Sequence, residues 1–273
     1  MSLQGKTLFI TGASRGIGRE IALRAARDGA NIVIAAKSAE AHPKLPGTIH
    51  SVAAEVEAAG GKALAIQLDV RDEVAVKAAR AQAAEHCGGI DAVINNAGAI
   101  KLVGIEKLEP KRFDLMFQIN TRAVMVCSQA ALPYLKLSKG HILSLSPPLN
   151  LDPKWFASYA PYTTTKYGMS MLTLGMHEEF KKYAISVNAL WPQTVIATAA
   201  IEFELGGQHA FKHARTPAIM ADAAYAILNS SERSISGRLL IDEEILREQG
   251  ESDFEQYRFD PDGGALMPDL FVG

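Results

Sequence analysis

The chain has 273 residues, of which 48% are hydrophobic and 21% charged, proportions typical of globular proteins. Its 28 Lys and Arg residues oppose 30 Asp and Glu residues, and the formal net charge of -2 provides no basic field for binding nucleic acid or an anionic membrane. No apolar run reaches the roughly 18 residues that a membrane-spanning helix needs. Cys87 and Cys127 form no C-x-x-C pair. We therefore expect a soluble, cytoplasmic protein that acts on small molecules, with two reduced thiols.

Short apolar runs rich in β-branched residues alternate with longer segments of helical periodicity along the chain. This pattern is typical of repeated strand-helix-strand units. The continuous hydrophobicity of the runs indicates that helices cover both faces of the sheet. The sequence thus predicts one domain over residues 1–273, with a doubly wound α/β fold built on a seven-stranded parallel sheet. The predicted strands are 7–11, 31–36, 63–68, 92–95, 141–146, 186–190 and 238–241.

The predicted helices begin with a crossover helix over 16–29, where Gly29 acts as a stop signal. Two long apolar helices are expected at 111–135 and 162–183, and helices of this kind often pair with a second copy of themselves. The stretch 38–48 is predicted to be an inserted loop because it contains prolines and a glycine. The tail at 242–273 shows little periodicity, so we expect it to be irregular.

A glycine-rich turn follows the first predicted strand and opens the first helix. Gly12, Gly16 and Gly18 have the spacing G-x-x-x-G-x-G. Glycines there allow close backbone approach, and the free N–H groups and dipole of the helix attract a pyrophosphate. The alternative is an ordinary turn with no ligand. The position directly after a strand favours a dinucleotide site.

The second predicted strand ends in Ala36, Lys37 and Ser38, where an NAD-binding protein usually has an acidic residue for the ribose 2′-hydroxyl. Lys37 and Arg15 offer positive charge to a 2′-phosphate. The alternative is that both are solvated surface charges. The sequence therefore favours NADP(H) over NAD(H).

Tyr162 and Lys166 stand four residues apart, so they project from the same face of the second long helix. A nearby ammonium stabilises a phenolate and lowers the pKa of the phenol, which makes Tyr162 a usable proton donor and acceptor. A Y-x-x-x-K pair alone is common on ordinary helices. The pair indicates a catalytic site only in combination with the motifs that precede it.

Together these motifs resemble the short-chain dehydrogenase/reductase family, and the resemblance covers essentially the whole chain. It rests on the turn at 11–18, on Asp69 and Val70 after the third strand, on the Asn-Asn-Ala-Gly run at 95–98, on Asn120, and on Tyr162 with Lys166. It implies a Rossmann fold, an oxidoreductase activity with a nicotinamide cofactor, and assembly as a homodimer or homotetramer. The residues that it assigns to the cofactor are Gly12, Ser14, Arg15, Gly16, Ile17, Gly18, Lys37, Asp69, Val70, Asn96, Ala97, Gly98, Tyr162, Lys166, Pro192 and Thr194.

The resemblance also implies the catalytic roles. Tyr162 exchanges a proton with the carbonyl or hydroxyl oxygen, Lys166 also holds the nicotinamide ribose, and Asn120 keeps a helix open around a proton-relay water. The family's helper serine is missing, because Pro147 occupies its place at the strand end. Ser146 is the candidate substitute. The alternative is that Ser146 only closes the strand.

Two further segments depart from the family pattern or vary within it. Gln193 replaces the usual glycine between Pro192 and Thr194, which puts the conformation of that loop in doubt. The stretch at about 196–216 resembles the family's mobile substrate lid. Phe203, Leu205 and Phe211 in it form either an apolar pocket or a packing face.

Two readings of the function follow. The first is an NADP(H)-dependent oxidoreductase that transfers a hydride between the nicotinamide and a carbonyl or alcohol substrate of apolar, lipid-like character. The second, motivated by Pro147, is a dinucleotide-binding protein with weak activity that serves as a lipid-binding or regulatory module. His209 and His213 stand four apart, but no HExxH motif or third ligand accompanies them, so we predict no metal.

Overall fold

Seven strands form one all-parallel sheet in the order β3-β2-β1-β4-β5-β6-β7 in the computed structural model, which describes residues 2–42, 45–204, 207–230 and 235–273. The predicted doubly wound fold is confirmed, and the strands lie within two residues of their predicted bounds. They are β1 (Thr7–Thr11), β2 (Asn31–Ala36), β3 (Lys62–Gln67), β4 (Ala92–Asn95), β5 (His141–Ser144), β6 (Ser186–Trp191) and β7 (Leu239–Ile241).

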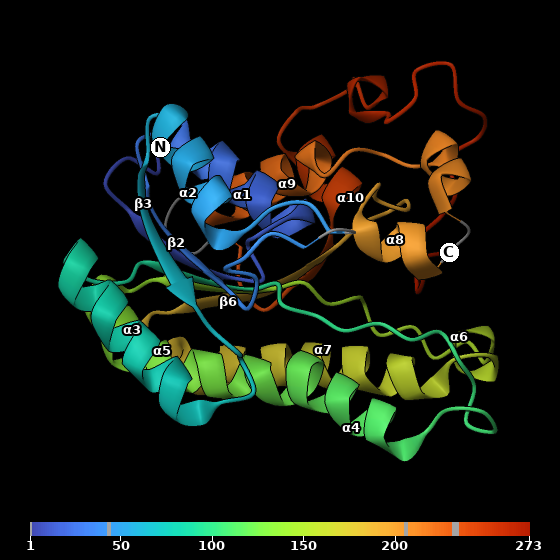
Figure 1. Cartoon of the computed structure of the whole chain (residues 1–273), viewed down its shortest axis with the longest axis horizontal. Coiled ribbons are helices and arrows are strands. Elements are labelled where there is room, and N and C mark those ends of the chain that lie inside the picture. Colours follow the sequence, from blue (N-terminus) through green and yellow to red (C-terminus); the bar gives the residue numbers. More distant parts are fainter. Residues whose placement is uncertain (1, 43–44, 205–206, 231–234) are drawn as a thin grey trace.

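Helices cover both faces of the sheet (Figure 1). One layer contains α1 (Gly16–Ala26), α2 (Ile49–Ala58), α9 (Ala218–Leu228) and α10 (Asp242–Glu248). The other contains α3 (Glu73–Cys87), α4 (Pro110–Phe117), α5 (Ala123–Ser138) and α7 (Ala160–Phe180). The short helices α6 (Lys154–Ala157) and α8 (Ala199–Glu204) lie toward one end of the molecule.

The two cores follow from the alternation of side chains along each strand. Ile10 and Ile34 pack with α1 and α2, whereas their neighbours Phe9 and Val33 pack with α3 and α5. All four side chains are fully buried. Since successive side chains on a strand point to opposite faces, a strand buried on both sides must be apolar at every position. This is why continuous apolar runs predicted the strands so closely.

The strand order places a crevice at the carboxyl ends of β1 and β4. From β1 the chain builds outward through β2 and β3, and it then returns to the other side of β1 to form β4. The connections on the two sides therefore diverge where β1 and β4 end. In open α/β sheets, ligands bind at this switch point.

The inserted loop at 38–48 ends where α2 begins, as predicted, although residues 43–44 lie outside the described part of the chain. Thr48 caps the helix: its hydroxyl accepts a hydrogen bond from Ser51 N at 3.0 Å, and Thr48 N donates to Ser51 Oγ at 2.9 Å. This reciprocal capping box satisfies backbone donors that a helix start otherwise leaves unpaired.

The expectation of an irregular tail from residue 242 is wrong at its beginning. Helix α10 starts immediately after β7, and its first turn holds Asp242, Glu243 and Glu244. Acidic side chains stabilise the positive end of a helix dipole. With only seven residues, α10 is too short to produce a clear periodic signal.

The last residues, 265–273, pack against the loop that follows β6; we call them the C-terminal segment. Val195 N donates to Met267 O at 2.9 Å, and Trp191 Nε1 donates to Leu270 O at 2.8 Å. The Phe271 ring is only 1% exposed, and the rings of Trp155, Tyr162, Tyr167 and Trp191 all have their centroids within 6.3 Å of it. The segment is therefore an integral part of the fold.

No helix in the described parts of the chain has the length and apolar character needed to cross a bilayer.

Removing the Phe271 ring tests this docking. Phe271→Ala should lower the free energy of unfolding by about 3–5 kcal/mol, the range for truncating a buried aromatic side chain. Urea titration followed by circular dichroism measures the loss. Phe259→Ala is the matched control, because Phe259 lies in the same tail but is 48% exposed. Equal unfolding midpoints for the two variants would show that the segment is not docked.

Candidate active site

A cavity of about 880 Å³ runs along the carboxyl ends of the strands and collects most of the predicted site residues. This volume lies within the range of small-molecule and cofactor sites. Its walls include Gly12, Ser14, Arg15, Gly16, Ile17, Lys37, Asp69, Val70, Asn96, Ala97, Gly98, Asn120, Tyr162, Lys166 and Pro192. Three predicted residues, Gly18, Ser146 and Thr194, do not line it.

The glycine-rich turn is clamped to the end of β4. Asn96 Nδ2 donates to Thr11 O at 2.9 Å and to Gly12 O at 3.0 Å. A Cβ atom on Gly18 would lie 2.5 Å from Asn96 Nδ2, and one on Gly12, whose φ is +67°, would lie 2.9 Å from Ala97 Cα. Gly18 thus serves the packing of the turn rather than the cavity wall. These positions require glycine because the two segments approach so closely.

The start of α1 suits the pyrophosphate of a dinucleotide. Its N-cap residue, Arg15, makes no side-chain capping hydrogen bond. The first N–H groups of the helix therefore lack the partner that a Ser, Thr or Asp cap supplies. Gly16 has a φ of +57° and keeps a side chain out of the cavity wall. The turn fits a dinucleotide by this geometry.

The adenosine end of the cavity carries cations that are already paired. Lys37 Nζ lies 3.3 Å from Asp69 Oδ2, and Arg15 Nη2 donates to Ser38 Oγ at 3.0 Å and to Gly47 O at 3.2 Å. Hydrogen bonds from Arg71 lower the pKa of Asp69, so its carboxylate is charged at neutral pH. Both cations line the cavity, but the Lys37 side chain is 63% exposed, so the alternative of a solvated charge stays open for Lys37.

Tyr162 and Lys166 lie one helical turn apart in α7 and line the cavity together. Tyr162 is 6% exposed and Lys166 7% exposed. Lys166 Nζ donates to Leu145 O at 2.6 Å and lies 4.7 Å from the centroid of the Trp191 ring. A buried ammonium is held here by one carbonyl and one aromatic face.

The pKa values in this buried site differ from the sequence-based expectation. Burial, with a further contribution from the Asp269 carboxylate, raises the pKa of Tyr162 above its usual value. Burial lowers the pKa of Lys166 to about 7, and Asp269 opposes that shift. The prediction of a lowered pKa for Tyr162 is therefore wrong for this structure, because desolvation and the Asp269 carboxylate both act in the opposite direction. Tyr162 is protonated at neutral pH.

Asn120 lies in a π-helical turn, Gln118–Arg122, that joins α4 to α5. Its side chain is fully buried: Oδ1 accepts from Ala99 N at 2.8 Å, and Nδ2 donates to Ala99 O and Thr165 Oγ1, both at 2.9 Å. Such single turns often occur at functional sites. The long helix predicted at 111–135 is thus opened at Asn120, in the way that the family resemblance implied.

Ser146 is fully buried, and its hydroxyl has no hydrogen-bond partner within the described residues. Its neighbour Leu145 lines the cavity, and Ser146 does not. Strand β5 ends at Ser144, and Ser146 N donates back to Ser144 O at 3.0 Å, so the backbone turns at this point. This geometry favours the alternative that Ser146 only closes the strand.

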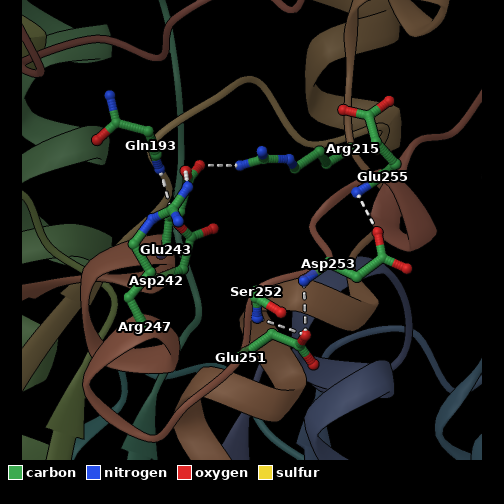
Figure 2. A network of polar contacts seen from close by, with 9 residues as sticks. All are labelled: Gln193, Arg215, Asp242, Glu243, Arg247, Glu251, Ser252, Asp253 and Glu255. Atoms are coloured by element: carbon green, nitrogen blue, oxygen red, sulfur yellow. Dashed lines mark hydrogen bonds and ion pairs between the residues drawn. The ribbon is translucent and has the colours of Figure 1, made fainter.

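The start of α10 forms polar contacts with the loop that follows β6 (Figure 2). Gln193 N donates to Asp242 Oδ1 at 2.8 Å, and the neighbouring Glu243 pairs with the buried Arg215 at 2.5 Å. Burial raises the pKa of Asp242 to about 6. The side chain at position 193 does not form this hydrogen bond, so the loop accommodates Gln where the family has Gly.

Thr194 follows in this loop and is 7% exposed. Its Oγ1 is buried and has no hydrogen-bond partner among the residues that the structure describes. A buried hydroxyl without a partner costs free energy unless a ligand or water satisfies it. Like Ser146, Thr194 has a buried, unpartnered hydroxyl among the described residues and does not line the cavity.

The predicted lid contains α8 and a 3-10 helix, Gly207–His213. Ile201, Glu202 and Phe211 from it line the cavity, so Phe211 belongs to a pocket wall. Nothing is described of the Phe203 side chain, and Leu205 lies outside the described residues. Within residues 2–42, 45–204, 207–230 and 235–273, no three His, Cys, Asp or Glu residues cluster as metal ligands would.

Two contributions to the cavity were missed by sequence reasoning. Asp269 and Leu270 enter it from the C-terminal segment, and Leu45 and Pro46 enter from the inserted loop. The available signal was the apolar run at residues 270–272, which ends an otherwise polar tail and indicates that the tail folds back onto the body.

The family model of the short chain dehydrogenases matches residues 6–204. The chain belongs to the short-chain dehydrogenase/reductase family. It is 57% identical to hydroxysteroid dehydrogenase-like protein 2 of Xenopus tropicalis over 271 residues. That match covers 99% of this chain but 64% of the relative, so the chain spans just under two thirds of the length of the curated relative.

Solved structures agree with this assignment. A Xanthomonas campestris protein that is 53% identical superposes with a TM-score of 0.96 over the whole of both chains. A short chain dehydrogenase of Burkholderia cenocepacia in complex with NADP is 31% identical, has a TM-score of 0.76, and matches 88% of this chain and 97% of its own. A carveol dehydrogenase of Mycobacterium avium in complex with NAD shares the fold, at 24% identity and a TM-score of 0.74, over 88% of this chain and 96% of its own.

Asn96→Ala tests whether the clamp shapes the dinucleotide site. The variant loses two hydrogen bonds, so the free energy of unfolding should fall by about 1–3 kcal/mol. The released turn should also bind NADPH about tenfold more weakly. Chemical denaturation and fluorescence titration measure the two effects.

Asn31→Ala is the control. Asn31 Nδ2 also donates two hydrogen bonds, to Gly5 O and Thr7 Oγ1, but at the opposite end of the sheet. It should lose stability without losing affinity for NADPH. If Asn96→Ala behaves in the same way, the clamp has no role in cofactor binding.

Proposed function

We propose that the chain is an NADP(H)-dependent oxidoreductase that transfers a hydride between the nicotinamide and a carbonyl or alcohol substrate of apolar, lipid-like character. One observation carries the proposal. Tyr162 and Lys166 line the same cavity as the glycine-rich turn at the start of α1, with Asn120 in the π-turn beside them. A proton-transfer group thus shares one cavity with a dinucleotide-binding turn.

When bound, the nicotinamide supplies or accepts the hydride. Tyr162 gives the proton of its hydroxyl to the carbonyl oxygen in reduction, and it takes a proton from the substrate hydroxyl in oxidation. Lys166, held by Leu145 O, adds positive charge beside the reacting oxygen and would also hold the cofactor ribose. Asn120 keeps the π-turn open through its hydrogen bonds to Ala99 and Thr165. The Thr194 hydroxyl, which has no partner among the described residues, would form a hydrogen bond with the nicotinamide carboxamide.

The preference for NADP(H) rests on the end of β2. Ala36 and Lys37 line the cavity there, so no carboxylate on this strand end repels a 2′-phosphate. Asp69 neutralises part of the charge on Lys37, but Arg15 lines the same wall. Both cations can approach a phosphate by small side-chain movements.

The character of the substrate follows from the apolar part of the cavity wall. Ile100, Trp191, Ile196, Phe211 and Leu270 line the same cavity as Tyr162. Such a wall favours an apolar substrate, because burial of apolar surface supplies about 25 cal/mol per Å². The hydroxysteroid dehydrogenase-like name of the relatives agrees with a lipid-like molecule.

A second function is favoured by one specific observation. Ser146 does not line the cavity and Pro147 replaces the helper serine, so the strand end supplies no hydroxyl to the carbonyl oxygen. Losing one oxyanion donor costs on the order of a hundredfold in rate. The alternative is therefore a dinucleotide-binding protein that binds lipid or regulates, with little turnover.

The assembly and location belong to the same proposal. Helices α5 and α7 each expose a large apolar side chain. Met125 of α5 is 47% exposed, and Met171 of α7 is 59% exposed. These helices would pair with those of a second copy to form a homodimer or homotetramer. The free thiols of Cys87 and Cys127 suit a reducing, cytoplasmic setting.

Tyr162→Phe tests the activity. The variant keeps the ring but loses the proton, so turnover should fall by at least about a hundredfold while NADPH still binds. Absorbance of NADPH is followed with a panel of aldehydes, ketones and fatty acyl derivatives. Tyr134→Phe, on α5 outside the cavity, is the matched control. If the native protein binds NADPH tightly but turns over nothing in the panel, the binding function replaces the enzymatic one.

Lys37→Glu tests the cofactor preference. An acidic side chain at the end of β2 should repel the 2′-phosphate and accept the 2′-hydroxyl, so NADPH affinity should fall about 10- to 100-fold and NADH affinity should not. Fluorescence titration with both cofactors measures the ratio. Lys107→Glu, an exposed lysine outside the cavity, controls for net charge. An unchanged ratio would remove Lys37 from cofactor recognition.

A further inference from the structure

The C-terminal segment brings a carboxyl group into the reaction chamber. Asp269 lines the cavity with Tyr162 and Lys166, and it interacts electrostatically with both. Its Oδ1 accepts a hydrogen bond from Leu270 N at 2.6 Å. Asp269 is half-buried and lines the cavity, so its carboxyl group can meet a ligand there.

The carboxyl group is held in place by contacts on both sides of it. Asp269 N donates to Gln193 O at 3.1 Å, and Pro268 forms a β-bridge with Thr194. Two residues further on, Phe271 is fixed by its aromatic neighbours. Its φ of +71° is a left-handed conformation that costs an ordinary residue about 1–3 kcal/mol. Such strain persists only where packing over-determines the backbone, and it occurs mainly at functional sites.

The position of Asp269 matters because the strand side of the cavity lacks a hydroxyl donor. Ser146 does not line the cavity, and Pro147 has no donor at all. We propose that the Asp269 carboxyl group replaces the helper serine and donates the second hydrogen bond to the reacting substrate oxygen, beside the one from Tyr162. This inference rests on the proposed reductase activity and adds a catalytic residue to it.

The surroundings of Asp269 favour its protonated form. Burial and the nearby Asp242 carboxylate raise the pKa of Asp269 to about 7, and Lys166 opposes the shift. The groups facing it are Tyr162 and Lys166 on α7 and Asp242 at the start of α10. A protonated carboxyl group in an apolar site can donate a hydrogen bond to a developing oxyanion.

In the reductive step Asp269 keeps its proton. The hydride adds to the carbonyl carbon, the cofactor is oxidised, and the Oη–H bond of Tyr162 breaks as its proton goes to the carbonyl oxygen. Asp269 only stabilises the negative charge that builds on that oxygen. Once ionised it would repel this charge, so reduction should slow as pH rises through the pKa of Asp269.

The test compares two substitutions of Asp269 in the whole chain. Asp269→Asn keeps the shape and an N–H donor, so kcat/KM for reduction should stay within about threefold at low pH, and the fall with rising pH should become shallower because Lys166 alone then titrates. Asp269→Ala should lose about 10- to 100-fold in kcat with little change in NADPH affinity. Rates are measured from about pH 5 to about pH 9 with a substrate of the native protein. Asp262→Asn, in an exposed turn of the same tail, is the control.

If Asp269 instead acts only as the counterion of Lys166, the pH profile of the Asp269→Asn variant differs. Removing the carboxylate would lower the pKa of Lys166 further, because Asp269 raises it. The fall in rate would then shift to lower pH in Asp269→Asn and keep its steepness. That result, or an Asp269→Ala variant as fast as the native protein, would overturn the proposal.

Two readouts keep this result separate from other failures. Infrared difference spectra between the native protein and Asp269→Asn should show a protonated carboxyl band that titrates near neutral pH, whether or not a substrate is present. Loss of folding in Asp269→Ala would appear in circular dichroism, and Asp269→Asn then carries the test. If the native protein and Tyr162→Phe are both inactive, the proposed activity fails rather than the role of Asp269.

Discussion

The burial of a single ammonium group organises the reaction chamber. Lys166 is charged only if its surroundings replace the water that it loses, and the structure offers it a carbonyl at 2.6 Å and the face of Trp191. These two partners come from the end of β5 and the end of β6. The position of one charge thus depends on two parts of the chain that are far apart in sequence from each other.

The same arrangement explains why the tail belongs to the site. Phe271 packs beside Tyr162, and its segment hydrogen-bonds to the loop at 192–195 that would meet the nicotinamide. Asp242 supports that loop from the other side through Gln193 N. The substrate and cofactor ends of the cavity therefore share one wall, formed by the loop and held between α10 and the tail.

Local sequence patterns predicted the elements that are buried on both sides of the sheet or are determined by residues close in sequence. The strands were predictable because each needs apolar residues at every position, and the spacing of Tyr162 and Lys166 needed only the geometry of a helix. The glycine-rich turn was likewise local. The sequence-based fold therefore holds closely, and most residues predicted for the dinucleotide line one cavity.

The predictions that failed depend on how residues far apart in the sequence are brought together. The expected direction of the Tyr162 pKa shift was wrong because it considered one charge four residues away and not the desolvation imposed by the whole fold. Asp269 was missed because no local pattern says which cavity a tail enters. Ser146 has the expected residue type in the expected stretch, but it does not line the cavity, because the chain turns directly after β5. An active-site hydroxyl that is missing from its usual place is thus better sought among all the polar groups that line the cavity than among the neighbours of the lost residue, and here that search leads to a carboxyl group at the far end of the chain.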